Sequence, residues 1–256
     1  MDFRDKTVFI TGAGSGMGRL AARNLAAAGA HVAAVDLSEG GLAETAAGHS
    51  SMRTFTADVT DADHLCAVVA EVEAEMGPIE RVYNAAAIFP LGRLLDQDRE
   101  TILRIMDINY GGVVNVAKAA LPAMIERGRG DMILFASMAG WVPLIYMGAY
   151  NASKFAVVAF AEVLYHENRD SGVRFACVCP PPVDTPLIAR DKQAVWPKLL
   201  DEAPPIQPQD VLDAIDRTLD DGSFWVFPGR GTRVGWILRR WAPGLMWKRM
   251  HKVEGV

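Results

Sequence analysis

The chain has 256 residues, 50% of them hydrophobic, and a formal net charge of −5. This length and composition suit one α/β domain with a large core, and the negative charge argues against nucleic acid as the main partner. The first residues lack a signal-peptide pattern and no apolar run is long enough to span a bilayer, so we expect a cytoplasmic protein.

The cysteines and histidines give no sign of a metal site. Three cysteines form an odd and sparse set, which indicates a reducing compartment without a disulfide framework. The five histidines are scattered, and none lies at metal-ligand spacing from a cysteine or another histidine. We therefore expect no bound metal.

Short apolar runs alternate with helical patterns along most of the chain. In chain order we predict a strand at 6–11, a helix at about 17–28, strands at 31–36 and 53–57, a helix at 61–76, a strand at 81–85, a helix at about 97–127, a strand at 132–136, a helix at 150–169 and a strand at 173–178. Thr60 or Asp61 is a suitable N-cap for the second helix. The alternation predicts a Rossmann-like, doubly wound parallel sheet with helices on both faces.

A glycine-rich turn joins the first strand to the first helix. It reads Thr11-Gly12-Ala13-Gly14-Ser15-Gly16-Met17-Gly18, with four glycines within seven residues. Glycines let the backbone turn tightly and approach a pyrophosphate, whose charge is favoured at a helix N-terminus. We predict that Gly12, Ser15, Gly16, Met17 and Gly18 bind a dinucleotide.

The second strand ends at Asp36. A carboxylate there can accept hydrogen bonds from the adenosine ribose and repels a 2′-phosphate, and neither Ser15 nor Leu37 supplies a cation. We therefore expect NAD rather than NADP. Asp58 and Val59 follow the third strand, where Asp58 either borders the adenine ring or caps the next helix.

Tyr150 and Lys154 lie four residues apart in a predicted helix and so share one face. A nearby ammonium favours phenolate over phenol, so we expect a lowered pKa for Tyr150 and proton exchange near neutral pH.

These motifs, with Asn84-Ala85-Ala86, Asn109 and Ser137 in order between them, resemble the short-chain dehydrogenase/reductase family up to about Phe227. The resemblance implies that Tyr150 is the general acid/base. Lys154 would lower the pKa of Tyr150 and hold the nicotinamide ribose, and Ser137 would polarise the substrate oxygen. Asn109 would anchor a water that relays protons from Lys154 to solvent, unless it only bonds to the helix backbone.

The resemblance also extends the cofactor site to the ends of later strands. It implies that Asn84, Ala85, Ala86, Pro180, Val183 and Thr185 contact the cofactor, together with Tyr150 and Lys154. Two positions depart from the family pattern, which has glycine where this chain has Ala86 and Pro181. The extra methyl of Ala86 and the missing N–H of Pro181 should alter the local seating of the cofactor.

A proline-rich segment at about 180–209, with Trp196, is predicted to be a substrate lid. We expect the substrate to contact Ser137 and Tyr150 and an apolar wall that includes Trp141, Val142, Leu187 and Trp196, with Ile88, Phe89, Tyr146 and Ile188 as further candidates. Such a wall suits a hydrophobic secondary alcohol or ketone, of a steroid-like, aromatic, terpenoid or long-chain kind.

The last segment differs from the rest of the chain. We divide the chain into a domain at 1–229 and a tail at 230–256, which has seven Lys and Arg residues, one acid and three tryptophans. Val234, Ile237, Leu238 and Trp241 fall on one helical face, with arginines opposite. The tail either packs on another subunit or over the pocket, or lies on an anionic membrane. The family resemblance implies a homo-oligomer, a tetramer or a dimer.

Three functions fit these patterns. The first is an NAD-dependent oxidoreductase that acts on a hydrophobic alcohol or ketone. The second is a reductase of 3-oxoacyl thioesters, which Asp36 disfavours because such enzymes more often use NADPH. The third is a non-catalytic dinucleotide-binding regulatory protein, which the presence of Asn109, Ser137, Tyr150 and Lys154 disfavours.

Overall fold

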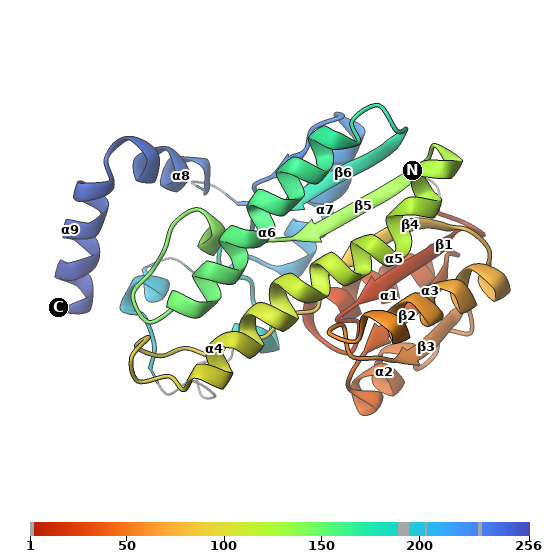
Figure 1. Cartoon of the computed structure of the whole chain (residues 1–256), viewed down its shortest axis with the longest axis horizontal. Coiled ribbons are helices and arrows are strands. Elements are labelled where there is room, and N and C mark those ends of the chain that lie inside the picture. The colour runs from red at the N-terminus through yellow and green to blue at the C-terminus, as the bar shows by residue number, and fades with distance from the viewer. Residues whose placement is uncertain (1–2, 189–194, 203, 230–231) are drawn as a thin grey trace.

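The structure, a computed structural model, describes residues 3–188, 195–202, 204–229 and 232–256. The described residues form a seven-stranded sheet in the order β3-β2-β1-β4-β5-β6-β7, and all neighbouring strands are parallel (Figure 1). The strands are β1 (Thr7–Thr11), β2 (His31–Asp36), β3 (Met52–Thr56), β4 (Ile79–Asn84), β5 (Gly130–Phe135), β6 (Val173–Val178) and β7 (Trp225–Val226). The predicted doubly wound, single-domain α/β fold is confirmed.

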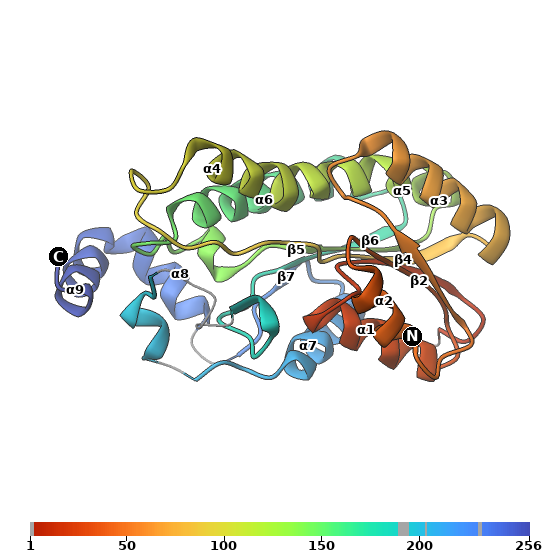
Figure 2. The ribbon, with the colours of Figure 1, turned by 90° about the horizontal axis from the view of Figure 1, so that it is seen from below.

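Helices cover both faces of the sheet (Figure 2). One layer holds α3 (Ala62–Met76), α4 (Arg99–Met106), α5 (Gly112–Arg127) and α6 (Gly148–Glu167), and the other holds α1 (Gly16–Ala27), α2 (Glu39–Ala46) and α7 (Pro208–Asp220). Each face has its own buried apolar core, because side chains on successive strand residues point to opposite faces. The chain changes layer between α2 and α3, which opens a crevice at the carboxyl ends of β1 and β4.

The predicted boundaries differ from the structure where the sequence pattern is weak or interrupted. The expected helix at 97–127 is two α-helices joined by a π-helical turn at Asp107–Gly111. α2, α7 and β7 were not predicted: α2 begins with Glu39-Gly40-Gly41, β7 has only two residues, and α7 starts at Pro208, inside the proposed lid. Asp61 is the N-cap of α3, as one of the two alternatives had it.

Beyond the carboxyl ends of β5 and β6 the molecule is built from short turns and the tail. Among the described residues, 3₁₀ turns lie at Met138–Gly140 (η2), Pro186–Ile188 (η3) and Lys198–Asp201 (η5), and the tail forms α8 (Thr232–Trp241) and α9 (Pro243–Glu254). α9 packs against α8 and against η5. Within the described ranges, the structure has no helix long and apolar enough to cross a membrane. Residues 189–194 of the predicted lid lie outside the described residues.

A buried ionic cluster ties the sheet together near the amino ends of three strands. Arg81 on β4 and Arg174 on β6 each bind the carboxylate of Asp131 on β5, at 2.7 Å. Arg81 also pairs with Asp216 of α7 at 2.6 Å, and the ring of Phe3 lies over its guanidinium. This cluster therefore lies toward the amino ends of the strands, whereas the crevice between β1 and β4 lies at their carboxyl ends.

Candidate active site

The turn between β1 and α1 packs so tightly that side chains are excluded at two of its glycines. A Cβ atom on Gly12 would lie 2.9 Å from the Ala86 backbone nitrogen, and Gly12 has a φ of +70°. A Cβ atom on Gly18 would lie 2.2 Å from the Gly12 carbonyl oxygen. These contacts bring the start of α1 against the end of β4 and leave an open groove above the turn.

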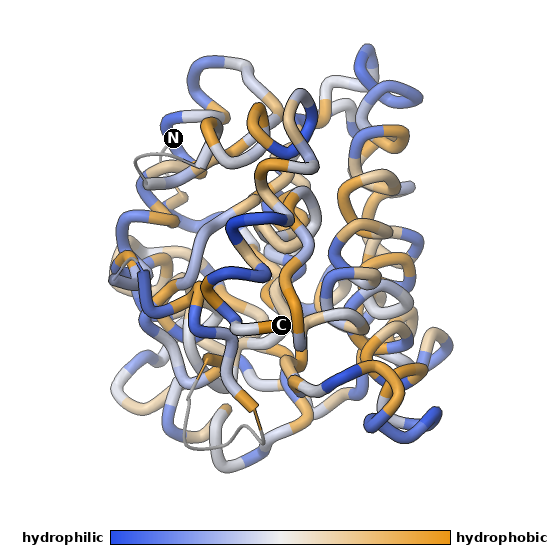
Figure 3. Tube along the Cα trace, turned by 90° about the vertical axis from the view of Figure 1, so that its left-hand side faces the viewer, coloured by the Kyte–Doolittle hydropathy of each residue, from blue (hydrophilic) through white to orange (hydrophobic). Residues whose placement is uncertain are grey.

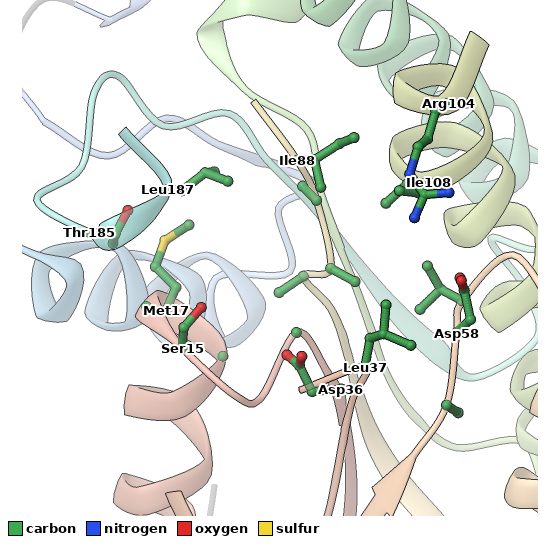
Figure 4. Close-up of a pocket in the computed structure, with 18 residues that line it drawn as sticks. Ser15, Met17, Asp36, Leu37, Asp58, Ile88, Arg104, Ile108, Thr185 and Leu187 are labelled. Carbon is green, nitrogen blue, oxygen red and sulfur yellow. The ribbon is translucent and has the colours of Figure 1, made fainter. Parts of the chain in front are cut away.

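The groove collects most of the residues predicted to bind the cofactor. Its lining includes Gly12, Ser15, Gly16, Met17, Gly18, Asp36, Leu37, Asp58, Val59, Ala85, Ala86 and Thr185 (Figure 4). Asn84 lies behind this surface: its side-chain Nδ2 donates to the Val113 carbonyl at 3.1 Å, and it lines neither the groove nor the cavity described below. Asn84 therefore ties β4 to the start of α5.

Asp36 stands at the groove with its carboxylate held in place. Oδ2 accepts a hydrogen bond from the Gly14 N–H and Oδ1 one from the Ser38 N–H, both at 2.9 Å. A Cβ atom on Gly14 would lie 2.8 Å from the Asp36 carboxyl carbon, so glycine is required there too. Because each carboxylate oxygen has a second lone pair, the group can still accept from ribose hydroxyls.

Asp58 does not cap α3, because Asp61 does. Instead Asp58 Oδ1 accepts from the N–H and the hydroxyl of Thr60, at 2.9 and 2.8 Å. The hydrogen bond from the Thr60 N–H, with a smaller contribution from the positive charge of Arg104, lowers the pKa of Asp58. Asp58 is thus a charged residue at the rim of the groove.

Arg104 is a lining residue that the sequence patterns did not indicate. It extends from α4 toward the groove on the Asp58 side, whereas Asp36 stands on the Ser15 side (Figure 4). Ile108, one turn further along, lines the same groove. The groove has a glycine cradle at the N-terminus of the 12-residue helix α1 and a held carboxylate at the end of β2, so its residues fit a dinucleotide.

Tyr150 and Lys154 occupy neighbouring turns of α6 and are both buried. Lys154 Nζ donates to the Phe135 carbonyl at 2.7 Å and lies 5.8 Å from the centre of the Tyr150 ring. Phe89 packs edge-on against that ring, with the ring centres 4.6 Å apart. The pair therefore sits in a largely apolar wall.

Burial shifts the pKa values of both members of this pair. Burial raises the pKa of Tyr150 to about 12, and a hydrogen bond with Ser137 opposes the rise. Burial also lowers the pKa of Lys154 to about 8. The direction of the shift for Tyr150 is therefore opposite to the expected one, because burial removes the phenolate from water.

Ser137 and Asn109 are both positioned by the backbone around them. Ser137 caps η2, where its Oγ accepts from the Ala139 N–H at 3.1 Å. Asn109 is buried in the π turn, accepts from the Ile88 N–H at 2.8 Å, and donates to the Ile88 carbonyl and to Ser153 Oγ. Asn109 thus fixes the loop after β4 against α6, and its role in a water relay stays a prediction.

A cavity of about 420 Å³ adjoins the groove and reaches Ser137, Tyr150 and Lys154. Phe89, Val142, Leu187, Ile188 and Trp196 line it, together with the cofactor-site candidates Pro180, Val183 and Thr185. The sequence reasoning missed Met138, Leu144, Met147, Leu199, Leu200, Thr232 and Gly235, which also line it. Among its described lining residues, Lys154 alone carries a charge.

Three other candidates for the substrate wall lie elsewhere. Ile88 lines the dinucleotide groove, and Tyr146 lies beside a separate surface groove. Trp141 donates to Cys179 Sγ at 3.2 Å and packs edge-on against Trp225 and Trp236. Trp141 therefore belongs to an aromatic cluster that anchors α8 to the sheet.

The segment after β6 closes the cavity on the sheet side. The Pro180 carbonyl accepts from the Met138 N–H at 2.9 Å, which ties this segment to η2. Val183 forms a parallel bridge with Ile206. Pro181 lines the cavity, and neither of these two backbone links uses it.

A dinucleotide cradle that opens onto a buried tyrosine–lysine pair defines an oxidoreductase of the doubly wound class. A family model described as short chain dehydrogenase matches residues 6–196. The chain belongs to the short-chain dehydrogenase family.

The relatives of this chain differ in how much of their own length they share with it. The chain is 30% identical to the 17-beta-hydroxysteroid dehydrogenase 13 of Rattus norvegicus, over 98% of the chain and 84% of that protein. It is 37% identical to a Mycobacterium tuberculosis protein named "Probable oxidoreductase EphD", over 73% of the chain but only 32% of that longer protein. The chain thus corresponds to about a third of the length of that relative.

Among solved structures, a short-chain dehydrogenase/reductase from Burkholderia phymatum in complex with NAD is similar to the whole chain. The TM-score is 0.84 at 27% identity, and the match covers 96% of both chains.

Proposed function

We propose that this protein is an NAD-dependent dehydrogenase or reductase that transfers hydride between nicotinamide and a hydrophobic secondary alcohol or ketone. The observation that carries the proposal is the cavity at Tyr150, whose described walls are apolar apart from a few hydroxyl groups and Lys154. An apolar cavity of this size with few polar groups favours a largely hydrophobic ligand held by one oxygen. The relative named for a hydroxysteroid supports the same substrate class.

The chemistry follows from the placement of three side chains. A bound nicotinamide dinucleotide supplies the hydride acceptor or donor. In the reductive direction the Tyr150 hydroxyl donates its proton to the carbonyl oxygen, and Ser137 holds that oxygen by a hydrogen bond. In the oxidative direction the Tyr150 phenolate takes the alcohol proton, and Lys154 stabilises the phenolate and holds the ribose. Asn109 keeps the neighbouring loop in position, and a water held near it passes protons out to solvent during oxidation and in from solvent during reduction.

The cofactor preference rests on Asp36. Its carboxylate is held at the groove by two backbone N–H groups and so cannot easily turn away from a 2′-phosphate. Like-charge repulsion at this position favours NAD over NADP. We also propose a homo-oligomer, dimer or tetramer, on the family resemblance.

The proposed role of Tyr150 is tested with Tyr150→Phe, which keeps the ring and removes the proton. We expect NADH binding to change little and turnover to fall by about a thousandfold or more. Val142→Leu, a change in the apolar wall, is the matched control and should alter KM while leaving proton transfer intact. Turnover that persists in Tyr150→Phe would rule out the assigned role.

A screen of NADH formation across secondary alcohols separates this proposal from the two alternatives. Activity on apolar alcohols with NAD supports it. Activity confined to 3-oxoacyl thioesters with NADPH would favour a thioester reductase. Tight NADH binding without turnover on any substrate would favour a regulatory protein.

A further inference from the structure

The outward face of α8 carries large hydrophobic side chains that the fold leaves exposed. Val234, Ile237 and Trp241 are 66%, 48% and 80% exposed, and Leu245, at the start of α9, is 62% exposed. The first three are spaced i, i+3 and i+7, so they share one side of the helix. We call these four residues the α8 stripe. The stripe holds four of the eleven large hydrophobic residues that are exposed in the described chain.

The opposite side of α8 is already occupied, so the stripe cannot turn inward. Trp236 packs against Trp141 and Phe227, with ring centres 5.6 and 6.5 Å apart. Thr232 and Gly235 line the substrate cavity. One helix therefore separates the cavity from the exposed stripe.

The charged residues of α8 and α9 themselves are almost all basic. Residues 232–256 contain six Lys and Arg residues and a single acid, Glu254. Glu254 is buried and accepts hydrogen bonds from the N–H groups of Lys198 and Leu199, so its charge is turned away from the surface. Arg240, Lys248 and Lys252 are exposed on the two helices that carry the stripe, whereas Arg249 is paired with Glu202. Figure 3 views the molecule from the side on which the C-terminus lies.

An exposed apolar stripe beside exposed cations could contact a second copy of the chain or a lipid surface. A second copy of the chain, docked by the same face, would bring cations against cations and would have to overcome their repulsion. An anionic lipid surface pairs with the cations and takes up the apolar stripe, with Trp241 at the boundary between headgroups and acyl chains. The charge complementarity therefore favours lipid.

We propose that the α8 stripe and the surrounding cations dock this protein on an anionic lipid surface. α8 then has two functions, since its inner side walls the cavity and its outer side contacts the lipid. Resting on the proposed function, the inference adds that the hydrophobic substrate is drawn from the lipid phase, where such a molecule concentrates. The docking itself does not depend on catalysis.

Vesicle co-sedimentation tests the docking. Wild-type protein should bind vesicles of phosphatidylcholine and phosphatidylglycerol, bind phosphatidylcholine alone about tenfold or more weakly, and lose affinity as salt is raised. The double variant Ile237→Asp, Trp241→Asp should bind the anionic vesicles about tenfold or more weakly. Leu95→Asp, at a side chain that is 99% exposed in a loop, is the matched control and should bind like wild type.

The remaining outcomes are also decisive. Equal binding by the double variant and wild type, or equal binding to neutral and anionic vesicles, would overturn the proposal. A smaller oligomer in the double variant, with no vesicle binding by wild type, would show that the stripe faces a second copy. Tyr150→Phe should bind vesicles normally, so a failure of the catalytic proposal leaves this test intact.

Substrate delivery has its own readout. For an alcohol dissolved in anionic vesicles, the double variant should show a higher apparent KM, whereas its turnover of a water-soluble alcohol should match that of wild type. An unchanged KM on the vesicle substrate would refute delivery from lipid.

Discussion

Lys154 carries its charge on a side chain that is almost completely buried. Its Nζ has the Phe135 carbonyl as a hydrogen-bond partner, and burial lowers its pKa to about 8. Below that pH the lysine is charged in the folded and the unfolded chain, and the full cost of burying the charge is present. Between about pH 8 and 10.5 the folded chain releases its proton first, so the free energy of unfolding rises with pH.

Replacing this lysine should therefore stabilise the protein while it abolishes turnover. The lowered pKa corresponds to about 3 kcal/mol, and losing the bond to Phe135 offsets about 1 kcal/mol, so Lys154→Met should raise the free energy of unfolding by about 2 kcal/mol at about pH 7. The gain should shrink by about pH 10. Urea denaturation at both pH values measures it. A gain that is the same at both would contradict the assigned charge burial.

Arg104 and Asp36 should affect dinucleotide binding in different ways. Asp36→Ser removes the repulsion of a 2′-phosphate. The dissociation constant of NADPH divided by that of NADH should therefore fall by about tenfold. Arg104→Leu should weaken the binding of NADH and of NADPH by a similar factor, about threefold to tenfold. The factor is similar because Arg104 stands on the Asp58 side of the groove, away from Asp36. Calorimetry with both cofactors measures this. If Arg104→Leu weakened NADPH alone, Arg104 would be a 2′-phosphate ligand.

At the residue scale, the predictable part of the site is the part with a fixed chemical spacing. Tyr150 and Lys154 share a helix face, and Asp36 ends a strand, so the sequence alone predicts where they lie. Arg104 was missed because its role depends on how α4 crosses the groove. The raised pKa of Tyr150 was missed because the packing of Phe89 against the ring cannot be read from spacing.

The element that shapes the far wall of the cavity is the short turn η5. Leu199 and Leu200 line the cavity, and the carboxylate of Glu254 on α9 accepts from the Lys198 and Leu199 N–H groups at 3.2 and 3.0 Å. An ion pair between Arg249 and Glu202, at 2.5 Å, adds a second link. The tail thus fastens a wall of the substrate cavity.

Breaking this link should loosen the wall without disturbing the chemistry. Glu254→Ala leaves the N–H groups of Lys198 and Leu199 without their acceptor and should raise KM for a hydrophobic substrate by about tenfold, with NADH binding unchanged. Glu254→Gln retains one acceptor oxygen and should lie between wild type and Glu254→Ala. Steady-state kinetics with both variants measure the effect. An equal loss of NADH affinity would point to general unfolding instead.

Regular elements were predicted best where a single period runs unbroken. The strands and α3 have such patterns, whereas the π turn at Asp107–Gly111 interrupts a helical pattern without any proline or glycine before Gly111. η5 could not be predicted, because it depends on the distant Glu254 more than on its own residues. The amphipathic pattern of the tail could be predicted, but not which side of the helix would face the cavity.

At the scale of the whole molecule, the candidate active site and the buried ionic cluster lie at opposite ends of the strands. The crevice and the tyrosine–lysine pair lie at the carboxyl ends of the strands, and the cluster of Arg81, Asp131 and Arg174 lies toward the amino ends. The fold class could be predicted from alternation alone. This cluster could not, because its members come from three strands far apart in sequence.

This separation predicts a stability variant with normal kinetics. Asp131→Asn leaves two arginines without their shared counter-charge and should lower the free energy of unfolding by about 3 kcal/mol, with KM and NADH affinity unchanged. Glu80→Gln breaks the more exposed pair with Arg129 and should lower it by less than about 1 kcal/mol. Denaturation and kinetics on both variants test this. A similar small effect of both would show that the cluster is not important for folding.

The family model ends at residue 196, and four of the described residues that line the cavity come after it. Leu199, Leu200, Thr232 and Gly235 all lie beyond that point, whereas the cofactor groove up to Ile108 and the Tyr150–Lys154 pair lie before it. One part of the cavity wall is thus encoded after the stretch that carries the cofactor groove and the Tyr150–Lys154 pair. A chimaera that exchanges residues 195–256 with those of another family member should therefore shift the substrate preference. Its cofactor groove and its Tyr150–Lys154 pair should remain intact.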